Sequence, residues 1–164
     1  MGVGKTTIGR QLARELSLEF HDSDQEIEAR AGADIAWIFD VEGEEGFRER
    51  ETHMLDELTA REGVLISTGG GSVLRDENRE MLKARGAVVM LDTSVELQLK
   101  RTEKDKKRPH LQRGDREETL RRMRTERQPL YESVADVKVF VGEGSSKRLV
   151  GGIVKSLREK GLIE

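Results

Sequence analysis

The chain has no cysteine, only two prolines, and aromatic residues that make up just 4% of its 164 residues. Without cysteine, the fold cannot use disulfides, a thiol nucleophile or thiolate metal ligands. No apolar run approaches the roughly 18 residues of a transmembrane helix, and the sequence contains no recognisable secretory signal peptide. These absences predict a cytoplasmic protein rather than a membrane-embedded or secreted one.

Neither sign of charge dominates, because 29 Lys and Arg residues against 32 Asp and Glu residues give a formal net charge of −3. The two signs are mixed along the chain, so nothing favours nucleic acid or a membrane surface as a partner. The length suits one domain, covering residues 1–164, with a core of its own. No surplus apolar face is evident, and we therefore expect a monomer.

Strand-like and helix-like segments alternate along the chain. Short apolar strands are expected at 18–24, 64–67, 87–91 and 137–141, with helical patterns between them. This alternation predicts an α/β fold with a parallel sheet. Residues 34–63 contain only helical patterns, interrupted at Gly43, and Gly32 is expected to end the helix before them. A helical region at 32–63 therefore lies beside the sheet.

Local signals predict where several helices begin and end. Ser23 with Glu26, and Thr93 with Glu96, have the spacing of capping boxes at helix N-termini. Pro129 is expected to end a helix over 117–127, because proline has no backbone N–H to continue the hydrogen-bond ladder. The sole tryptophan, Trp37, and the sole tyrosine, Tyr131, are expected to be packing residues.

The first seven residues, MGVGKTT, match the second half of the phosphate-binding motif G-x-x-x-x-G-K-[ST]. Ile8, Leu12 and Leu16 then recur at helical spacing, so a helix N-terminus faces the bound phosphates. The plainer alternative is a glycine-rich tail that carries a lysine. The first motif glycine and the strand that leads into the loop are not present. We expect codons upstream of Met1 to encode a Val/Ile/Leu run followed by glycine, which would supply a fifth, central strand.

Further polar and glycine-rich segments follow the expected strands. Asp22 and Asp24 stand at the carboxyl end of the first strand, the edge where ligands bind in open α/β sheets. Three consecutive glycines, Gly69–Gly71, follow the next strand and are costly unless another group approaches the backbone closely. Residues 104–115 are rich in Lys and Arg, have no periodicity, and are long enough to form a mobile lid.

Six segments of the chain, in the right order, resemble the shikimate kinase family: GVGKTTIGRQLA, FHDSDQEIE, EEGFRERE, STGGGSV, DKKRPHL and RQPLYESVAD. The resemblance implies a P-loop NTPase fold, a three-layer α/β/α sandwich whose parallel sheet has five strands in the family and four visible here. It also implies a substrate-binding helical region at 32–63 and a lid at about 104–115. The implied reaction is ATP- and Mg²⁺-dependent phosphorylation of shikimate to 3-phosphoshikimate, on the route to chorismate and the aromatic amino acids.

The resemblance also implies roles for individual residues. The implied ATP-binding residues are Gly2, Val3, Gly4, Lys5, Thr6, Thr7, Arg101 and Arg108. The implied Mg²⁺ ligands are Thr6 and Asp22, and the implied catalytic residues are Lys5, Asp24 and Arg108. The implied shikimate-binding residues are Asp24, Arg48, Gly69, Gly70, Gly71 and Arg127, with Phe47 and Glu51 as supports. Whether Asp24 takes the proton of the acceptor hydroxyl or only orients that hydroxyl stays open.

Three other functions stay open at this point. A gluconate-type small-molecule kinase would share the phosphate loop and lid, but it would not need Arg48, Gly69–Gly71 and Arg127 as a set. A nucleotide kinase would need a base-recognition pocket, for which residues 34–63 offer no evident candidate. The third is an inactive, truncated nucleotide-binding protein. Taken singly, each arginine could also be an ordinary solvated side chain on a charged helix.

Overall fold

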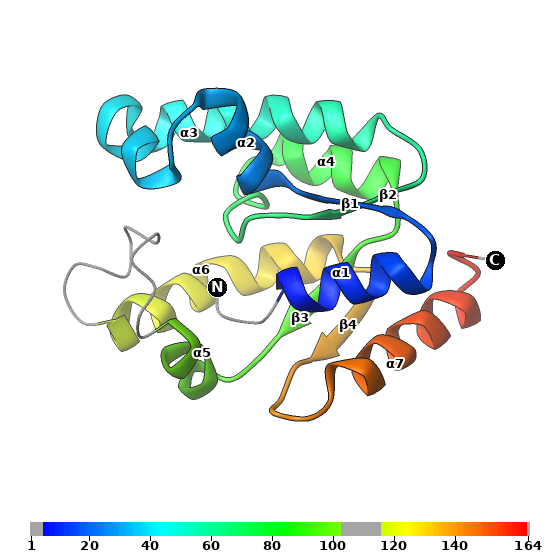
Figure 1. Cartoon of the computed structure of the whole chain (residues 1–164). Helices are drawn as coiled ribbons and strands as arrows, with labels where there is room; N and C mark the ends of the chain where they lie inside the picture. Colours follow the sequence, from blue (N-terminus) through cyan, green and yellow to red (C-terminus); the bar gives the residue numbers. More distant parts are fainter. Residues whose placement is uncertain (1–4, 103–115, 164) are drawn as a thin grey trace.

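The computed structural model describes residues 5–102 and 116–163 (Figure 1). In chain order the elements are α1 (Lys5–Glu15), β1 (Glu19–Asp22), α2 (Ser23–Ala31), α3 (Ile35–Thr59), β2 (Val64–Ser67), α4 (Asp76–Arg85), β3 (Val89–Asp92), α5 (Val95–Thr102), α6 (Arg116–Val134), β4 (Val137–Phe140) and α7 (Ser146–Glu159). All four expected strands are present, and the alternation of strands and helices predicted from the sequence is confirmed.

The strands form two parallel ribbons. β1 pairs with β2, with Glu19 opposite Val64, and β3 pairs with β4, with Val89 opposite Val137. Parallel pairing follows from the helices that return the chain between successive strands. Within the described residues no strand pairs with the other edge of β2 or of β3. The central fifth strand therefore stays a prediction.

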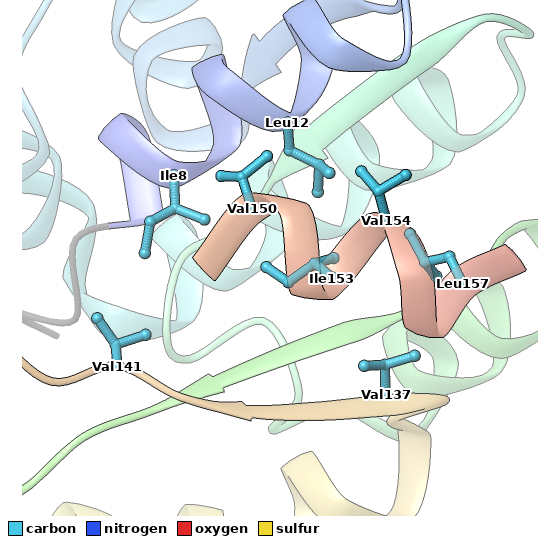
Figure 2. Packing of buried hydrophobic residues seen from close by; sticks show 8 residues of the cluster. All are labelled: Ile8, Leu12, Val137, Val141, Val150, Ile153, Val154 and Leu157. Carbon is cyan, nitrogen blue, oxygen red and sulfur yellow. The ribbon is translucent and has the colours of Figure 1, made fainter. Parts of the chain in front are cut away.

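One apolar cluster connects the two ribbons (Figure 2). It joins α1, β4 and α7 through eight buried side chains: Ile8, Leu12, Val137, Val141, Val150, Ile153, Val154 and Leu157. Leu65 of β2 and Val89 of β3 pack against the same cluster. Each fully buried aliphatic side chain contributes roughly 1.5–3 kcal/mol. The cluster therefore fixes α1, with Lys5 at its start, relative to both ribbons.

A second cluster holds the helical region against the β1–β2 ribbon, where α2, α3 and α4 gather (Figure 1). Its buried members are Ile27, Ile38, Phe47, Met54 and Leu58, and Ile66 of β2 packs against them. The break expected at Gly43 is confirmed, since its φ of 75° and ψ of 177° interrupt α3. The second half of α3 then presents Arg48 and Glu51 to the interior.

Both predicted capping boxes are wrong by one residue. Asp22, not Ser23, caps α2, because its Oδ1 accepts hydrogen bonds from the N–H groups of Asp24 (3.0 Å) and Gln25 (3.1 Å). Ser94, not Thr93, accepts a hydrogen bond from the N–H of Leu97. The buried Thr93 hydroxyl instead donates to the carbonyl of Val141 at 2.6 Å. Asp, Ser and Thr are all favoured N-cap residues. Residue type alone therefore could not decide which of two adjacent residues caps each helix.

Two further local predictions fail. The helix expected to stop before Pro129 continues as α6 to Val134. Proline inside a helix costs about 3 kcal/mol, a cost opposed here by the burial of Val134 and by tertiary contacts of Tyr131. Trp37 is not a packing residue, because it is 49% exposed. Within 5–102 and 116–163, no helix combines the length and apolar character needed to cross a bilayer.

Candidate active site

Three helices bring charged side chains together where β1 and β2 end. These side chains are Asp24 on α2, Arg48 and Glu51 on α3, and Arg127 on α6, and the Gly69–Gly71 run follows β2. Arg48 is 6% exposed, Glu51 is 0% exposed and Arg127 is 7% exposed. Charged side chains are almost never buried this deeply unless they are paired or serve a ligand.

The Arg48 guanidinium is held from two sides. Its Nη1 donates to Glu51 Oε1 at 3.0 Å and its Nη2 to Glu44 Oε1 at 3.4 Å. Three buried atoms of this cluster lack a hydrogen-bond partner among the described residues: Arg48 Nε, Glu51 Oε2 and Arg127 Nε. A guanidinium offers donors in a plane that matches a carboxylate. The cluster is therefore suited to binding a small anionic molecule.

The glycine run lies directly against these charged groups. A Cβ atom on Gly69 would lie 2.8 Å from Asp24 Oδ1, and one on Gly71 would overlap the guanidinium of Arg48. Neither overlap can be relieved without moving a charged side chain, the half-buried Asp24 or the buried Arg48. The close approach that the glycine run predicted is therefore present, with Asp24 and Arg48 as the neighbouring groups.

The charged groups also act on one another electrostatically. Burial raises the pKa of the Glu51 carboxyl, and the positive charge of Arg48 opposes that shift. The negative charge of Asp24 raises the pKa of Glu51 further, while Arg127 lowers it. Asp24, Arg48 and Arg127, which the sequence analysis assigned to one substrate, thus lie within electrostatic reach of one buried carboxyl.

A second group of predicted residues lies at the N-terminus of α1. Lys5 Nζ donates to the carbonyl of Thr68, just before the glycine run, at 2.6 Å. Thr6 Oγ1 donates to Asp22 Oδ2 at 3.5 Å, while the other oxygen of Asp22 caps α2. The first turn of α1 therefore stands beside the charged cluster, and Lys5 is the direct connection between them.

Thr7 and Arg101 line one wall of a cavity of about 960 Å³ between α1, β4 and α7. Gly142, Gly144 and Ser145, which follow β4, complete that wall, and Arg101 Nη2 donates to the carbonyl of Gly142 at 3.3 Å. A cavity beside a helix N-terminus suits a nucleotide. The predicted ATP residues Gly2, Val3, Gly4 and Arg108, and the predicted lid at 104–115, lie outside the described residues.

Sequence reasoning missed two contacts in this region. Tyr131 donates to the carbonyl of Gly70 at 2.5 Å. Arg124, which carried no signal of its own in the sequence, donates to Asp92 Oδ1 at 2.9 Å and to the carbonyl of Thr93 at 2.8 Å. The helical spacing of Tyr131 from Arg127, four residues, was the available signal, but Pro129 was expected to end the helix between them.

Comparison with known proteins decides the family. A family model described as "Shikimate kinase" matches residues 1–158. The chain belongs to the shikimate kinase family. It is 56% identical over 160 residues to the shikimate kinase of Vibrio campbellii, covering 98% of this chain and 93% of that one. The shikimate kinase of Vibrio cholerae is 54% identical over 159 residues, with 97% and 91% covered.

Solved structures of shikimate kinases match the fold as well. The enzyme from Acinetobacter baumannii in complex with shikimate superposes with a TM-score of 0.96 at 49% identity, over 99% of this chain and 91% of that one. The shikimate kinase of Aquifex aeolicus gives a TM-score of 0.85 at 37% identity, with 99% and 94% covered. The predicted shikimate kinase family, its enzyme class and the α/β fold class are therefore confirmed.

Proposed function

We propose that this shikimate kinase transfers the γ-phosphoryl group of ATP to a hydroxyl group of shikimate, giving 3-phosphoshikimate for the synthesis of chorismate and aromatic amino acids. The observation that carries the proposal is the buried pair of guanidinium groups, Arg48 and Arg127, next to Asp24 and the glycine run. Shikimate carries one carboxylate and several hydroxyls, which are the groups this cluster can bind. The shikimate-bound relative from Acinetobacter baumannii supports the same acceptor.

The acceptor residues divide between two tasks. Arg48 and Arg127 would bind the carboxylate, with Glu51 fixing the plane of the Arg48 guanidinium. Asp24 would accept a hydrogen bond from the hydroxyl that attacks the phosphorus, and the backbone of Gly69–Gly71 would border the ring. Residues 32–63 would thus form the substrate-binding region of a single kinase domain, 1–164.

The nucleotide residues would bind phosphate and adenine. Lys5 would place its ammonium on the β- and γ-phosphates, where negative charge is concentrated during transfer. Thr7 would lie beside the phosphates, and Arg101 with the Gly142–Ser145 loop would border the adenine in the 960 Å³ cavity. Gly2, Val3, Gly4 and Arg108 keep their predicted roles in holding the phosphates, with 104–115 as the lid.

Thr6 and Asp22 fit the predicted Mg²⁺ site. Both offer oxygen atoms, which Mg²⁺ prefers, and the Thr6 hydroxyl lies 3.5 Å from the Asp22 oxygen that does not cap α2. No described set of three or more His, Cys, Asp or Glu residues could hold a metal, so phosphate oxygens and water would complete the coordination. When bound, the ion would neutralise charge on the phosphates.

Release of ADP tests the proposed function directly. We expect the enzyme with ATP and Mg²⁺ to release ADP at a rate that rises with shikimate and saturates. Gluconate and nucleoside monophosphates serve as matched acceptors and should leave the rate at its background value. Stimulation by gluconate instead would indicate the gluconate-type kinase, and no stimulation by any acceptor would indicate an inactive nucleotide-binding protein.

Glu51→Gln tests the role of the buried carboxylate. Loss of a hydrogen bond between charged groups is worth about 1.5–3 kcal/mol, so we expect the KM for shikimate to rise roughly tenfold or more, with the KM for ATP unchanged.

The raised pKa of Glu51 means that folding opposes its ionisation. This unfavourable contribution is absent below the pKa of the unfolded chain and fully present above the raised value, so stability falls as pH rises between them. Glu51→Gln should remove that fall, as measured by urea unfolding across this range.

Glu57→Gln is the matched control for Glu51→Gln. Glu57 lies on the same helix, and its partner Arg30 lowers its pKa. Its contribution to stability is therefore present above the ordinary glutamate pKa and lost as pH falls. The Glu57→Gln enzyme should keep the wild-type KM for shikimate. Glu57→Gln should remove a loss of stability at falling pH, whereas Glu51→Gln removes a loss of stability at rising pH. An unchanged KM in Glu51→Gln would contradict the orienting role.

We further propose a cytoplasmic monomer whose partner is a small molecule rather than nucleic acid or a membrane. The near-balanced charge supports this.

A further inference from the structure

We propose that Tyr131 is a positioning residue of the acceptor site, which holds the peptide between Gly70 and Gly71 so that the N–H of Gly71 faces shikimate. The inference rests on the proposed function and adds a residue to it. Tyr131 belongs to the motif RQPLYESVAD, but the sequence analysis assigned it only to packing.

The Tyr131 hydroxyl is the link between α6 and the glycine run. It donates to the carbonyl of Gly70 at 2.5 Å, although the two residues are 61 positions apart in the chain. Arg127, one helical turn earlier, is close enough for its positive charge to act on the pKa of the same phenol group. Tyr131 therefore stands between a carboxylate-binding arginine and the backbone that borders the acceptor.

The hydroxyl keeps its proton at neutral pH and can therefore serve as the donor. Burial raises the pKa of the Tyr131 phenol, and the charge of Arg127 only partly opposes this. An ordinary tyrosine already titrates near pH ~10. The Gly70 carbonyl thus has a constant hydrogen-bond donor over the pH range in which kinases are assayed.

All three carbonyls of the glycine run are occupied. The hydroxyl and N–H of Ser72 donate to Gly69, at 2.7 and 3.1 Å, and the N–H of Leu74 donates to Gly71 at 3.1 Å. Tyr131 binds the remaining carbonyl, that of Gly70. Of these four donors, only the Tyr131 hydroxyl comes from a distant element rather than from the turn itself.

Fixing the Gly70 carbonyl also fixes the next N–H group. None of the described peptide bonds is cis, and in a trans peptide the C=O and the following N–H point in opposite directions. The Gly70 carbonyl points to Tyr131, so the Gly71 N–H points away from it. Within the described residues, no group accepts a hydrogen bond from that N–H. Because glycine rotates more freely than other residues, the peptide needs an external contact to hold this direction.

Tyr131→Phe removes the hydroxyl and keeps the ring, so it tests the hydrogen bond rather than the packing. Without the hydroxyl the Gly70 carbonyl loses its hydrogen bond from α6, so we expect the KM for shikimate to rise roughly tenfold. The KM for ATP and the kcat at saturating shikimate should stay within about twofold, because neither depends on this contact. Ser133→Ala is the matched control on the same helix. It removes a hydroxyl that donates to the carbonyl of Leu130 at 2.7 Å, and both KM values should stay unchanged.

Tyr131 is the sole tyrosine of the chain, so expression with a fluorinated tyrosine alters this position alone. The labelled enzyme offers a second test if the Tyr131→Phe variant does not fold. Fluorination lowers the pKa of a phenol, so the labelled enzyme should bind shikimate normally at neutral pH. Its KM for shikimate should then rise at a lower pH than that of the unlabelled enzyme, as the donor proton is lost.

The outcomes separate the inference from the function on which it rests. A wild-type enzyme whose ADP release ignores shikimate overturns the proposed function and the inference with it. Shikimate-dependent wild-type turnover with an unchanged KM in Tyr131→Phe overturns the inference alone. Identical pH profiles for labelled and unlabelled enzyme overturn it as well.

Discussion

Replacing Arg48 by alanine is expected to lower kcat/KM for shikimate by at least about a thousandfold while ATP still binds. The guanidinium is buried and would supply the planar pair of donors for the substrate carboxylate, a contact that a smaller or differently shaped group cannot reproduce. Buried charge-assisted hydrogen bonds of this kind are worth several kcal/mol when one partner is removed. Initial rates at saturating ATP with varied shikimate measure the loss.

Arg48→Ala also changes stability, which must be separated from its effect on binding. The variant leaves the buried Glu51 carboxyl without its positive partner, and removing one member of a buried pair costs about 3–5 kcal/mol. The double variant Arg48→Ala with Glu51→Gln removes both charges and should recover part of that stability. Its activity with shikimate should stay as low as that of Arg48→Ala alone, which a purely structural role of Arg48 does not predict.

Arg50→Ala is the matched control for Arg48→Ala. Arg50 lies on the same helix, but it is paired with Glu42 at 2.8 Å in a solvent-exposed position. Exposed ion pairs contribute little to stability, so this variant should keep wild-type activity and unfold at a similar temperature. If folded Arg48→Ala lost ATP affinity as fully as it lost shikimate turnover, Arg48 could not be assigned to the acceptor.

The main features of the fold could be predicted because each depends on a local pattern. Short segments rich in apolar residues, 64–67 and 137–141, correspond to β2 and, to within one residue, to β4. The helical spacing of Ile8 and Leu12 identified the helix α1. The glycine run also pointed correctly to a close approach. In each case the residues that carry the signal are near neighbours in sequence, so the sequence alone contains the information.

The side-chain contacts of the site could not be predicted in the same way. Residues 42–51 contain several acidic and basic side chains, and their spacing does not say that Arg48 and Glu51 are buried while Arg50 and Glu42 are paired at the surface. Only the packing of α3 on the β1–β2 ribbon decides which pair faces inward. The contact between Tyr131 and Gly70 likewise depends on α6 crossing to a loop 61 residues away.

Replacing Lys5 by methionine is expected to lower kcat about a thousandfold, the scale of losing a group that stabilises charge in a transition state. Lys5 is the first residue of α1, and its ammonium donates to the carbonyl of Thr68 at 2.6 Å, which directs it toward the end of β2 beside the glycine run. From there it can reach a phosphoryl group transferred between the nucleotide and acceptor sides. The KM for shikimate should change little, because no proposed acceptor contact involves Lys5.

Lys155→Met is the matched control for Lys5→Met. Lys155 is an exposed lysine of α7 whose nearest carboxylate oxygen, on Glu159, is 3.9 Å away. The Lys155→Met enzyme should turn over at the wild-type rate. A general effect of removing a lysine would instead slow both variants. Single-turnover measurements with preformed enzyme–ATP complex would separate loss of transfer from loss of nucleotide binding. A Lys5→Met enzyme that transfers phosphate at a rate within tenfold of wild type would show that the ammonium serves the Thr68 contact rather than the reaction.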